Sequence, residues 1–263
     1  MKTLYRVLPV PTSVSALILG LCFAFLTPAQ VTSPNGSYGI LVNQWKDSNS
    51  NAASSFLGVL NFNSAGNVSG SYTLVRKDYS VLTGTLTGTY SGNPDASNTV
   101  NLTFDVGATL IASVAVTDGG AGLQIMVTGG TATKVGQVIT GTGRVQSGGM
   151  PTGSYGMLLN RLPDQKNDPQ GVFGIFSLDG AGNITGSASI IGPNLPAPSI
   201  TTNYMGTYSV KPDGTGNVTV NLDLGFSSTF AIVVVDGGAG ILMLQTDESD
   251  GLGQILSGTA RMQ

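Results

Sequence analysis

The amino-acid sequence predicts an all-β protein made of two tandem, up-and-down antiparallel β-barrels of about eight strands each, with two β-sandwiches as the alternative. Three observations lead to this prediction. Most of the chain repeats once, apolar and polar residues alternate with a period of two, and glycine-rich clusters separate the alternating segments. Glycine supplies 38 of the 263 residues, whereas the helix formers glutamate and lysine are scarce. We therefore expect strands and hairpins rather than helices.

The first element of the chain is predicted to be a signal peptide, residues 1–29. Lys2 and Arg6 give it a positive start, Val14–Leu26 is an apolar core of 13 residues, and the small residue Ala29 suits a cleavage site. This core is too short for a transmembrane helix, which needs about 20 apolar residues. The expected location is therefore secreted or periplasmic, with no membrane span after signal cleavage.

The rest of the chain contains one module in two copies. The segment GSYGILVNQ of the first copy corresponds to GSYGMLLNR of the second, and GQVITGTGRVQ corresponds to GQILSGTARMQ. The offset between corresponding residues stays between 116 and 120. Each copy has about 112 residues, which is a usual size for an independent domain. The predicted domains are therefore residues 35–146 and 152–263, joined by a short glycine-rich linker at 147–151.

The strands of each copy are predicted from the alternation of apolar and polar residues. Val100–Val106 and Val218–Leu224 alternate as strands with one buried face do, whereas Phe230–Val235 is continuously apolar and fits a strand covered on both faces. Eight hairpin-linked strands lose their exposed edges when the sheet closes into a barrel. The predicted strands of the first copy are Tyr38–Asn43, Phe56–Phe62, Val68–Leu74, Thr85–Ser91, Val100–Val106, Leu110–Val116, Leu123–Val127 and Gln137–Val145.

Turn clusters rich in Gly, Asp and Asn separate these strands. Asn63–Asn67 and Asp118–Gly122 in the first copy correspond to Asp179–Asn183 and Asp236–Gly240 in the second. Glycine adopts the positive φ angles that tight hairpins need, and an Asp or Asn side chain accepts hydrogen bonds from its own turn. The clusters lack the alternating oxygen ligands and the closing glutamate of a calcium loop, so we expect turns rather than metal sites.

The composition excludes several kinds of chemistry. The chain has no histidine and one cysteine, Cys22, which lies inside the predicted signal peptide. A Ser-His-Asp triad, a histidine-containing zinc site and, after cleavage, a disulfide are therefore excluded. Charged residues make up 10% of the chain without a basic run, which argues against a nucleic-acid partner. We expect a protein that is not an enzyme and that has no cofactor or metal.

A Gly-Ser-Tyr motif opens each copy, ending at Tyr38 and Tyr155, and an arginine lies in each last strand, Arg144 and Arg261. This pairing resembles the lipocalin and avidin (calycin) barrels, in which Gly-x-Trp opens the first strand and an arginine of the closing strand packs on that ring; here Tyr replaces Trp. The resemblance implies that these four residues close the two barrels. The whole duplicated stretch is also similar to uncharacterised exported glycine-rich tandem β-repeat proteins of soil bacteria, which implies export and fold but no activity.

The interior of an eight-stranded barrel is either filled by side chains or holds one small ligand. If a pocket exists, the sequence nominates Asn43 and Asn160, at corresponding ends of the first strands, as its polar groups. Trp45 would supply an aromatic wall in the first copy only, because Leu162 replaces it in the second. The alternative is that both asparagines cap strand ends and that Trp45 covers a barrel mouth.

These observations leave two functions open. The first is an exported, non-catalytic structural or surface-interaction module built from two duplicated barrels. The alternative is a calycin-like binder or carrier of a small apolar ligand. The expected partner is accordingly either a small apolar ligand or a component of the cell surface.

Overall fold

The structure, a computed structural model, describes residues 33–45, 53–76, 80–93, 97–133, 137–162, 170–192, 197–247 and 255–263. The predicted signal peptide, residues 1–29, lies outside the described residues. Residues Thr32–Gln263 form one compact unit that contains both copies of the module.

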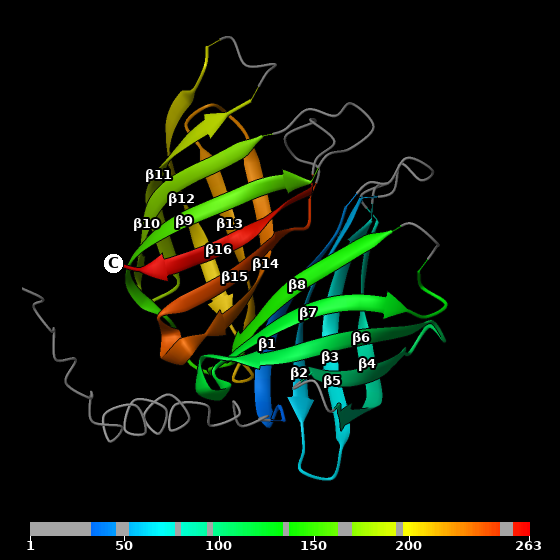
Figure 1. Cartoon of the computed structure of the whole chain (residues 1–263). Coiled ribbons are helices and arrows are strands. Elements are labelled where there is room, and N and C mark those ends of the chain that lie inside the picture. The colour runs from blue at the N-terminus through cyan, green and yellow to red at the C-terminus, as the bar shows by residue number, and fades with distance from the viewer. Residues whose placement is uncertain are drawn as a thin grey trace, which may run out of the picture. The chain divides into compact units, whose positions relative to one another are not determined.

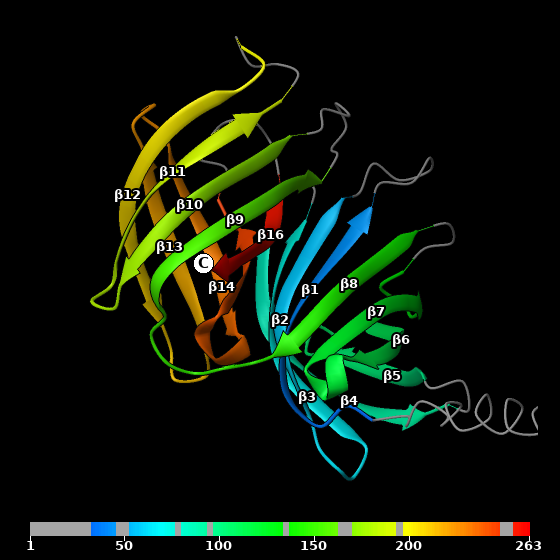
Figure 2. The ribbon, with the colours of Figure 1, turned by 60° about the vertical axis from the view of Figure 1, so that its left-hand side comes forward.

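The described part of the chain folds into two closed eight-stranded antiparallel barrels (Figures 1 and 2), which confirms the predicted fold class over the sandwich alternative. In each barrel every strand pairs with its sequence neighbours, and the last strand pairs with the first. Barrel 1 consists of β1 (Gly36–Trp45), β2 (Ser54–Phe62), β3 (Asn67–Arg76), β4 (Val81–Gly92), β5 (Ser97–Phe104), β6 (Thr109–Thr117), β7 (Gly122–Gly129) and β8 (Val138–Val145). Barrel 2 consists of β9 (Thr152–Leu162), β10 (Gly171–Asp179), β11 (Asn183–Ile191), β12 (Ile200–Val210), β13 (Thr215–Leu222), β14 (Ser227–Val235), β15 (Gly240–Gln245) and β16 (Ile255–Met262).

The period of two in the sequence corresponds to alternate burial along the strands. β10 alternates between buried and accessible residues along most of its length, so one face lines the barrel and the other faces outward. β14 differs, because from Phe230 to Val235 every residue is buried. This confirms the prediction that the continuous apolar run is covered on both faces.

A tight turn of the same form closes one end of each barrel. The 3₁₀ turns η1 (Asp118–Gly120) and η2 (Asp236–Gly238) each begin with an aspartate whose φ is positive, 52° and 55°. Two glycines with positive φ follow each aspartate, a conformation that side chains rarely adopt. Tyr38 Oη donates a hydrogen bond to Gly120 O at 2.7 Å, and Tyr155 Oη donates to Gly238 O at 2.6 Å. Each tyrosine therefore holds its turn from inside the barrel.

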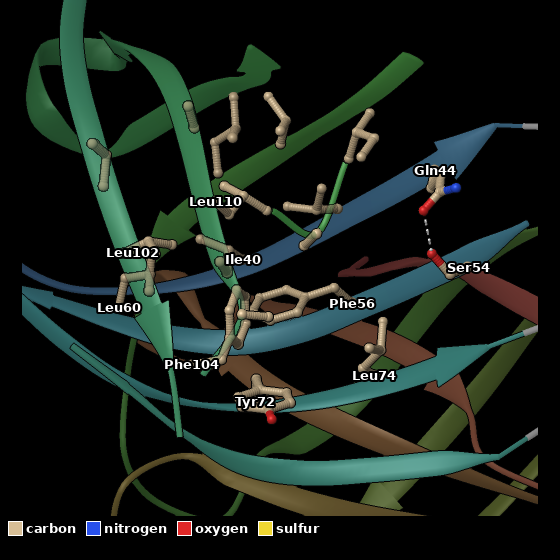
Figure 3. Close-up of a pocket in the computed structure, with 18 of the residues that line it drawn as sticks. Ile40, Gln44, Ser54, Phe56, Leu60, Tyr72, Leu74, Leu102, Phe104 and Leu110 are labelled. Atoms are coloured by element: carbon tan, nitrogen blue, oxygen red, sulfur yellow. Dashed lines mark hydrogen bonds between the residues drawn. The ribbon is translucent and has the colours of Figure 1, made fainter. Parts of the chain in front are cut away.

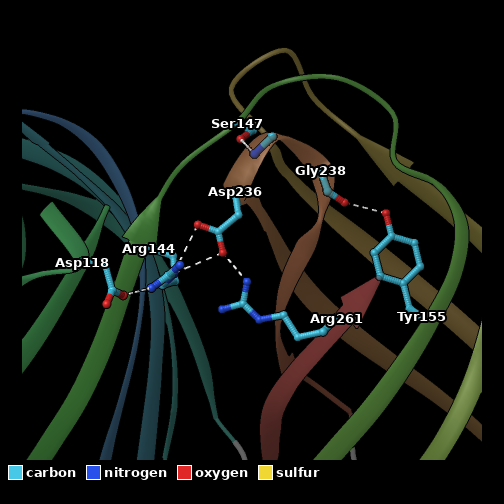
Figure 4. Close-up of polar contacts among 8 residues, drawn as sticks. Asp118, Arg144, Ser147, Tyr155, Asp236, Gly238 and Arg261 are labelled. Carbon is cyan, nitrogen blue, oxygen red and sulfur yellow. Dashed lines mark hydrogen bonds and ion pairs between the residues drawn. The ribbon is translucent and has the colours of Figure 1, made fainter. Parts of the chain in front are cut away.

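The arginines of the closing strands hold the same turns from outside. Arg144 lies opposite Gly39 in the β1–β8 pair, so it shares the outer face with Gly39 while Tyr38 points inward. Its guanidinium forms ion pairs with Asp118 and, through Nε at 3.1 Å, with Asp236 of barrel 2 (Figure 4). Arg261 likewise pairs with Asp236. The tyrosines expected to close the barrels thus lie on the first strands and the arginines on the last strands that pair with them. Each arginine binds aspartate rather than the tyrosine ring.

The two barrels pack through apolar outer faces. Strands β1–β3 with Ala53, the residue before β2, contribute one face, and β14–β16 with Leu162 of β9 contribute the other. The buried cluster between them consists of Leu41, Ala53, Leu57, Val59, Val75, Leu162, Ala231, Val233, Val235, Leu242, Leu244 and Ile255. The side chains of Val233 and Val235 pack directly on the β1 backbone at Gly39, where a Cβ atom would lie 2.6 Å from Val233 Cγ1.

The segment between the barrels is also held by hydrogen bonds. Ser147 N donates to Val234 O at 3.0 Å, and the Ser147 hydroxyl oxygen accepts from Gly237 N at 2.6 Å. At the other end Pro151 O accepts from Tyr208 Oη at 2.8 Å. The predicted linker, residues 147–151, is therefore anchored on barrel 2 at both of its ends.

Candidate functional site

Barrel 1 encloses a cavity of about 620 Å³ (Figure 3). Side chains from all eight strands line it, because the inward position recurs at every second residue. Most of the lining is aliphatic, with Ile40, Leu60, Leu102 and Leu110 among the residues that Figure 3 places around it. This volume lies within the usual range of small-molecule sites in proteins.

Three aromatic rings form one part of the cavity wall. Phe56 stacks on Tyr72 with ring centroids 5.7 Å apart and an interplanar angle of 14°. Phe104 meets both rings edge to face, at 5.0 Å from Tyr72 and 6.0 Å from Phe56. The three rings therefore form one continuous aromatic part of the cavity lining.

A hydrogen-bonded aspartate fixes the position of the Tyr72 ring. Tyr72 Oη donates to Asp105 Oδ1 at 3.0 Å, and Asp105 Oδ2 accepts from Thr85 N at 2.7 Å. The Thr85 amide and the Tyr72 hydroxyl lower the pKa of Asp105, while burial and then Asp105 raise the pKa of Tyr72. Gly84 leaves the space for this carboxylate, since a Cβ atom there would collide with it.

Polar groups gather at one end of the cavity. Gln44, Ser54, Arg76 and Gln137 line it where β1, β2, β3 and β8 reach the end of the barrel remote from Tyr38. Ser54 Oγ donates to Gln44 Oε1 at 2.9 Å (Figure 3). A ligand could therefore keep an apolar body inside the barrel and a polar or anionic group beside Arg76 at this mouth.

The corresponding lumen of barrel 2 contains bulkier side chains at two central positions. Phe230 occupies the position of Ala112, and Tyr204 occupies the position of Leu86, as the strand registers show. Both are buried in the core of barrel 2, and burial raises the pKa of Tyr204. Tyr204 Oη donates to Ile175 O at 3.4 Å, and the ring lies against Gly186 of the neighbouring strand. Barrel 2 therefore buries two rings at positions where barrel 1 has Ala112 and Leu86.

The structure places the three residues nominated for ligand binding outside the lumens. Asn43 lies on the outer face of β1, where its Oδ1 accepts from Ser55 Oγ at 2.6 Å and from Ser257 Oγ at 3.1 Å, so it joins the two barrels. Asn160 is exposed on the outer face of β9. Trp45 is 42% exposed on the outside of barrel 1, beside a hollow lined by residues of β1, β6, β7 and β8.

The polar group that β1 contributes to the cavity is Gln44 rather than Asn43. Tyr38 points inward, and a strand returns to the same face at every second residue, so Ile40, Val42 and Gln44 line the lumen. Counting along β1 in steps of two residues from the inward Tyr38 could have identified Gln44 from the sequence. No comparable signal identified Arg76 or Gln137.

Two further observations concern the residues that the structure describes. Among them, no group of three or more His, Cys, Asp or Glu side chains is arranged to hold a metal ion. Within the same residues, no helix has the length and apolar character needed to cross a membrane.

Comparison with known proteins gives no family for this chain. No protein-family model matches it, and no curated protein matches it. Among solved structures, it is similar to a redesigned β-barrel, mFAP0, bound to DFHBI, with 16% identity and a TM-score of 0.31 over 42% of this chain and 96% of that chain. It is also similar to a mutant of transferrin binding protein B from Haemophilus parasuis, with 12% identity and a TM-score of 0.28 over 78% of this chain. The match covers 52% of the transferrin binding protein B chain, about half its length.

A third similar structure is a porin-like protein from Bacteroides uniformis, with 8% identity and a TM-score of 0.18 over 88% of this chain and 97% of that chain. At these scores the likenesses carry no function to this chain. The candidate site therefore depends on the geometry of barrel 1 alone.

Proposed function

We propose that this protein is an exported, non-catalytic two-barrel protein whose first barrel binds a small, mainly apolar ligand. The observation that carries the proposal is the cavity of about 620 Å³ inside barrel 1, with its aliphatic and aromatic lining. A purely structural module gains nothing from an open lumen, because unfilled space forfeits packing contacts. The cavity therefore favours the carrier over the structural module among the two functions that the sequence left open.

The lining also indicates the character of the ligand. An apolar body of fused rings or an alkyl chain would contact Phe56, Tyr72 and Phe104, and its burial would supply the affinity. One hydrogen-bonding or anionic group would lie at the mouth, near Gln44 and Arg76. A strongly polar ligand such as a sugar would leave most of its hydroxyl groups without partners inside this barrel.

Export and the lack of catalysis rest on the sequence. The N-terminal pattern at residues 1–29 supports export, and the absence of histidine supports a non-catalytic role. Fractionation of the expressing cells followed by N-terminal sequencing tests the first point. A protein that begins at Gln30 in the periplasm or the medium would support export, whereas an intact Met1 in the cytoplasm would contradict it.

The binding proposal is tested with a neutral apolar fluorophore, N-phenyl-1-naphthylamine, and a variant that fills the lumen. Ala112→Phe copies the residue that barrel 2 carries at this position, so we expect saturable one-site binding by the natural chain and at least about tenfold weaker binding by the variant. The matched control is Ser113→Ala, which changes the next residue of β6, on the outer face of barrel 1, to the alanine that barrel 2 has at the corresponding position, Ala231. This variant should bind like the natural chain.

Equal binding by the natural chain and Ala112→Phe, with both folded by circular dichroism, would contradict the proposal. The natural ligand is then sought by native mass spectrometry after incubation with a mixed metabolite extract. We expect an adduct of one ligand per chain, and the adduct should be absent from Ala112→Phe.

A further inference from the structure

Barrel 2 carries an exposed apolar face on its outer side. We define the β9–β11 face as Leu158 on β9, Phe173 and Ile175 on β10, and Ile191 on β11. These side chains are between 47% and 61% exposed. Phe173 lies directly opposite Leu158 in the β9–β10 pair, and Ile175 follows on the same side of β10, so the residues are neighbours rather than scattered. An exposed apolar cluster of this kind is typical of an interaction surface.

The internal duplication shows what such a face does in the first copy. The corresponding residues of barrel 1 lie in the same register, with Leu57 opposite Leu41 in the β1–β2 pair. There they are buried against the apolar sheet β14–β16. The matched pairs are Leu41 with Leu158, Leu57 with Phe173, Val59 with Ile175, and Val75 with Ile191. The same face is therefore a docking surface in copy 1, whereas in copy 2 none of the residues that the structure describes covers it in this way.

Charge does not oppose burial of this face. The strand segments 152–160, 171–178 and 183–191 contain no Asp, Glu, Lys or Arg. Burial of the face would therefore require no charged group on these segments to lose its hydration. Asn160, at the position where Asn43 binds the other barrel, offers an amide at the edge of the face.

A second molecule could cover this face in two ways. In the first way, the second molecule offers the outer face of its β6–β8, the part of barrel 1 that corresponds to β14–β16 of barrel 2. Repeated contacts of this kind would produce an open chain of molecules. That face is more polar than β14–β16: Ser113, Ala115 and Gln124 take the places of Ala231, Val233 and Leu242. It therefore offers a poor match to Phe173 and its neighbours, and the apolar sheet face that fits is the β9–β11 face of the second molecule itself.

We propose that two copies of this chain associate through their β9–β11 faces, packed face to face about a two-fold axis. Such an interface is self-complementary and closes after two molecules, so it yields a dimer and no larger assembly. The packing of one β-sheet face on another repeats the kind of contact that already joins the two barrels of one chain. The residues that line the cavity of barrel 1 lie outside this interface, so the dimer proposal does not rest on the ligand proposal.

The proposal is tested by analytical ultracentrifugation of the full chain across the micromolar range. We expect a monomer–dimer equilibrium for the natural protein and at least about tenfold weaker association for Phe173→Asp, because a carboxylate would be buried without a partner. Met126→Asp, an equally outward substitution on β7 of the β6–β8 face, is the matched control and should dimerise normally. All variants keep the same N-terminus, so association through residues 1–29 would be unchanged among them.

Four outcomes would overturn the proposal. One is a natural protein that stays monomeric throughout the range, and another is a Phe173→Asp variant that dimerises normally. Growth into assemblies larger than a dimer, abolished by Met126→Asp, would instead assign the face to head-to-tail contacts. A monomer that binds phosphatidylglycerol vesicles through Phe173 would assign it to lipid. The milder variant Phe173→Ser, expected to weaken the dimer in the same direction, separates an interface effect from misfolding of Phe173→Asp.

Discussion

Barrel 1 encloses a cavity of about 620 Å³, whereas the corresponding central positions of barrel 2 hold the rings of Phe230 and Tyr204. The strand plan is the same in both barrels, so closure of the sheet does not decide whether the lumen is open. The difference depends on a few inward side chains. Barrel 1 has Ala112 and Leu86 at these positions and carries Phe56, Tyr72 and Phe104 in contact with one another, while barrel 2 buries Phe230 and Tyr204. After duplication, the two copies can therefore keep one strand plan while the side chains inside the barrels differ.

The largest expected effect comes from emptying barrel 2. Phe230→Ala removes a buried ring from the core and should lower the free energy of unfolding by about 3–5 kcal/mol. It also gives barrel 2 the residue that barrel 1 has at this position, so a second binding site for N-phenyl-1-naphthylamine should appear. Urea unfolding and fluorescence titration measure the two effects. Phe226→Ala, at a residue that is 48% exposed, is the control and should change stability by no more than about 0.5 kcal/mol.

A loss below about 1 kcal/mol for Phe230→Ala would show that the neighbouring side chains collapse into the space. The contrast between a filled and an open lumen would then be weaker than the static structure indicates.

An intermediate effect is expected where the two barrels meet. Gly39→Ala places a methyl group 2.6 Å from Val233 Cγ1, so the sheets must separate locally, at a cost of about 1–3 kcal/mol. Gly156→Ala is the matched control at the corresponding position of barrel 2, where the nearest atom is Gln263 Nε2 at 3.4 Å. It should leave the free energy of unfolding nearly unchanged. Equal effects of the two substitutions would mean that close packing at β1 is not what makes Gly39 necessary.

The smallest expected effect is a pH dependence at Asp105, which braces the cavity wall. The pKa of Asp105 is lowered below 3.8 in the folded protein, so its ionised form stabilises the fold above that pH, and this contribution is lost as the pH falls through the folded value. Asp105→Asn should therefore reduce stability at neutral pH, and the difference from the natural chain should vanish in strong acid. Thermal unfolding from neutral to strongly acidic pH measures it.

Asp223→Asn is the control for this substitution, because Ala188 stands at the position of Tyr72 in barrel 2 and cannot donate a hydrogen bond. A difference between Asp105→Asn and the natural chain that stayed constant with pH would contradict an electrostatic role of Asp105.

The sequence predicted the fold well because closure of the barrels depends on local patterns. Period-two segments, glycine-rich turns and the duplication each specify strands and hairpins without knowledge of distant contacts. The continuous apolar run Phe230–Val235 even predicted a strand covered on both faces, although not that barrel 1 covers it. The lumen could not be predicted in this way, because its volume depends on residues from opposite strands, such as Ala112 and Leu86, that no local pattern brings together.

The arginines show a second limit of prediction from the sequence. The recurrence of Tyr and Arg in both copies predicted that these residues close the barrels, and they lie on the paired first and last strands. The aspartates of the turns were interpreted only as braces for their own loops, although Asp118 and Asp236 bind those arginines. Because Asp118 lies 26 residues before Arg144, the pairing becomes visible only once β7 and β8 are folded against the turn.

Asp236 accepts hydrogen bonds from Arg144 of the first copy and Arg261 of the second, so one carboxylate belongs to both halves of the chain. A consequence is that the second copy, produced without the first, would keep Arg261 but lose Arg144 as a partner of this carboxylate.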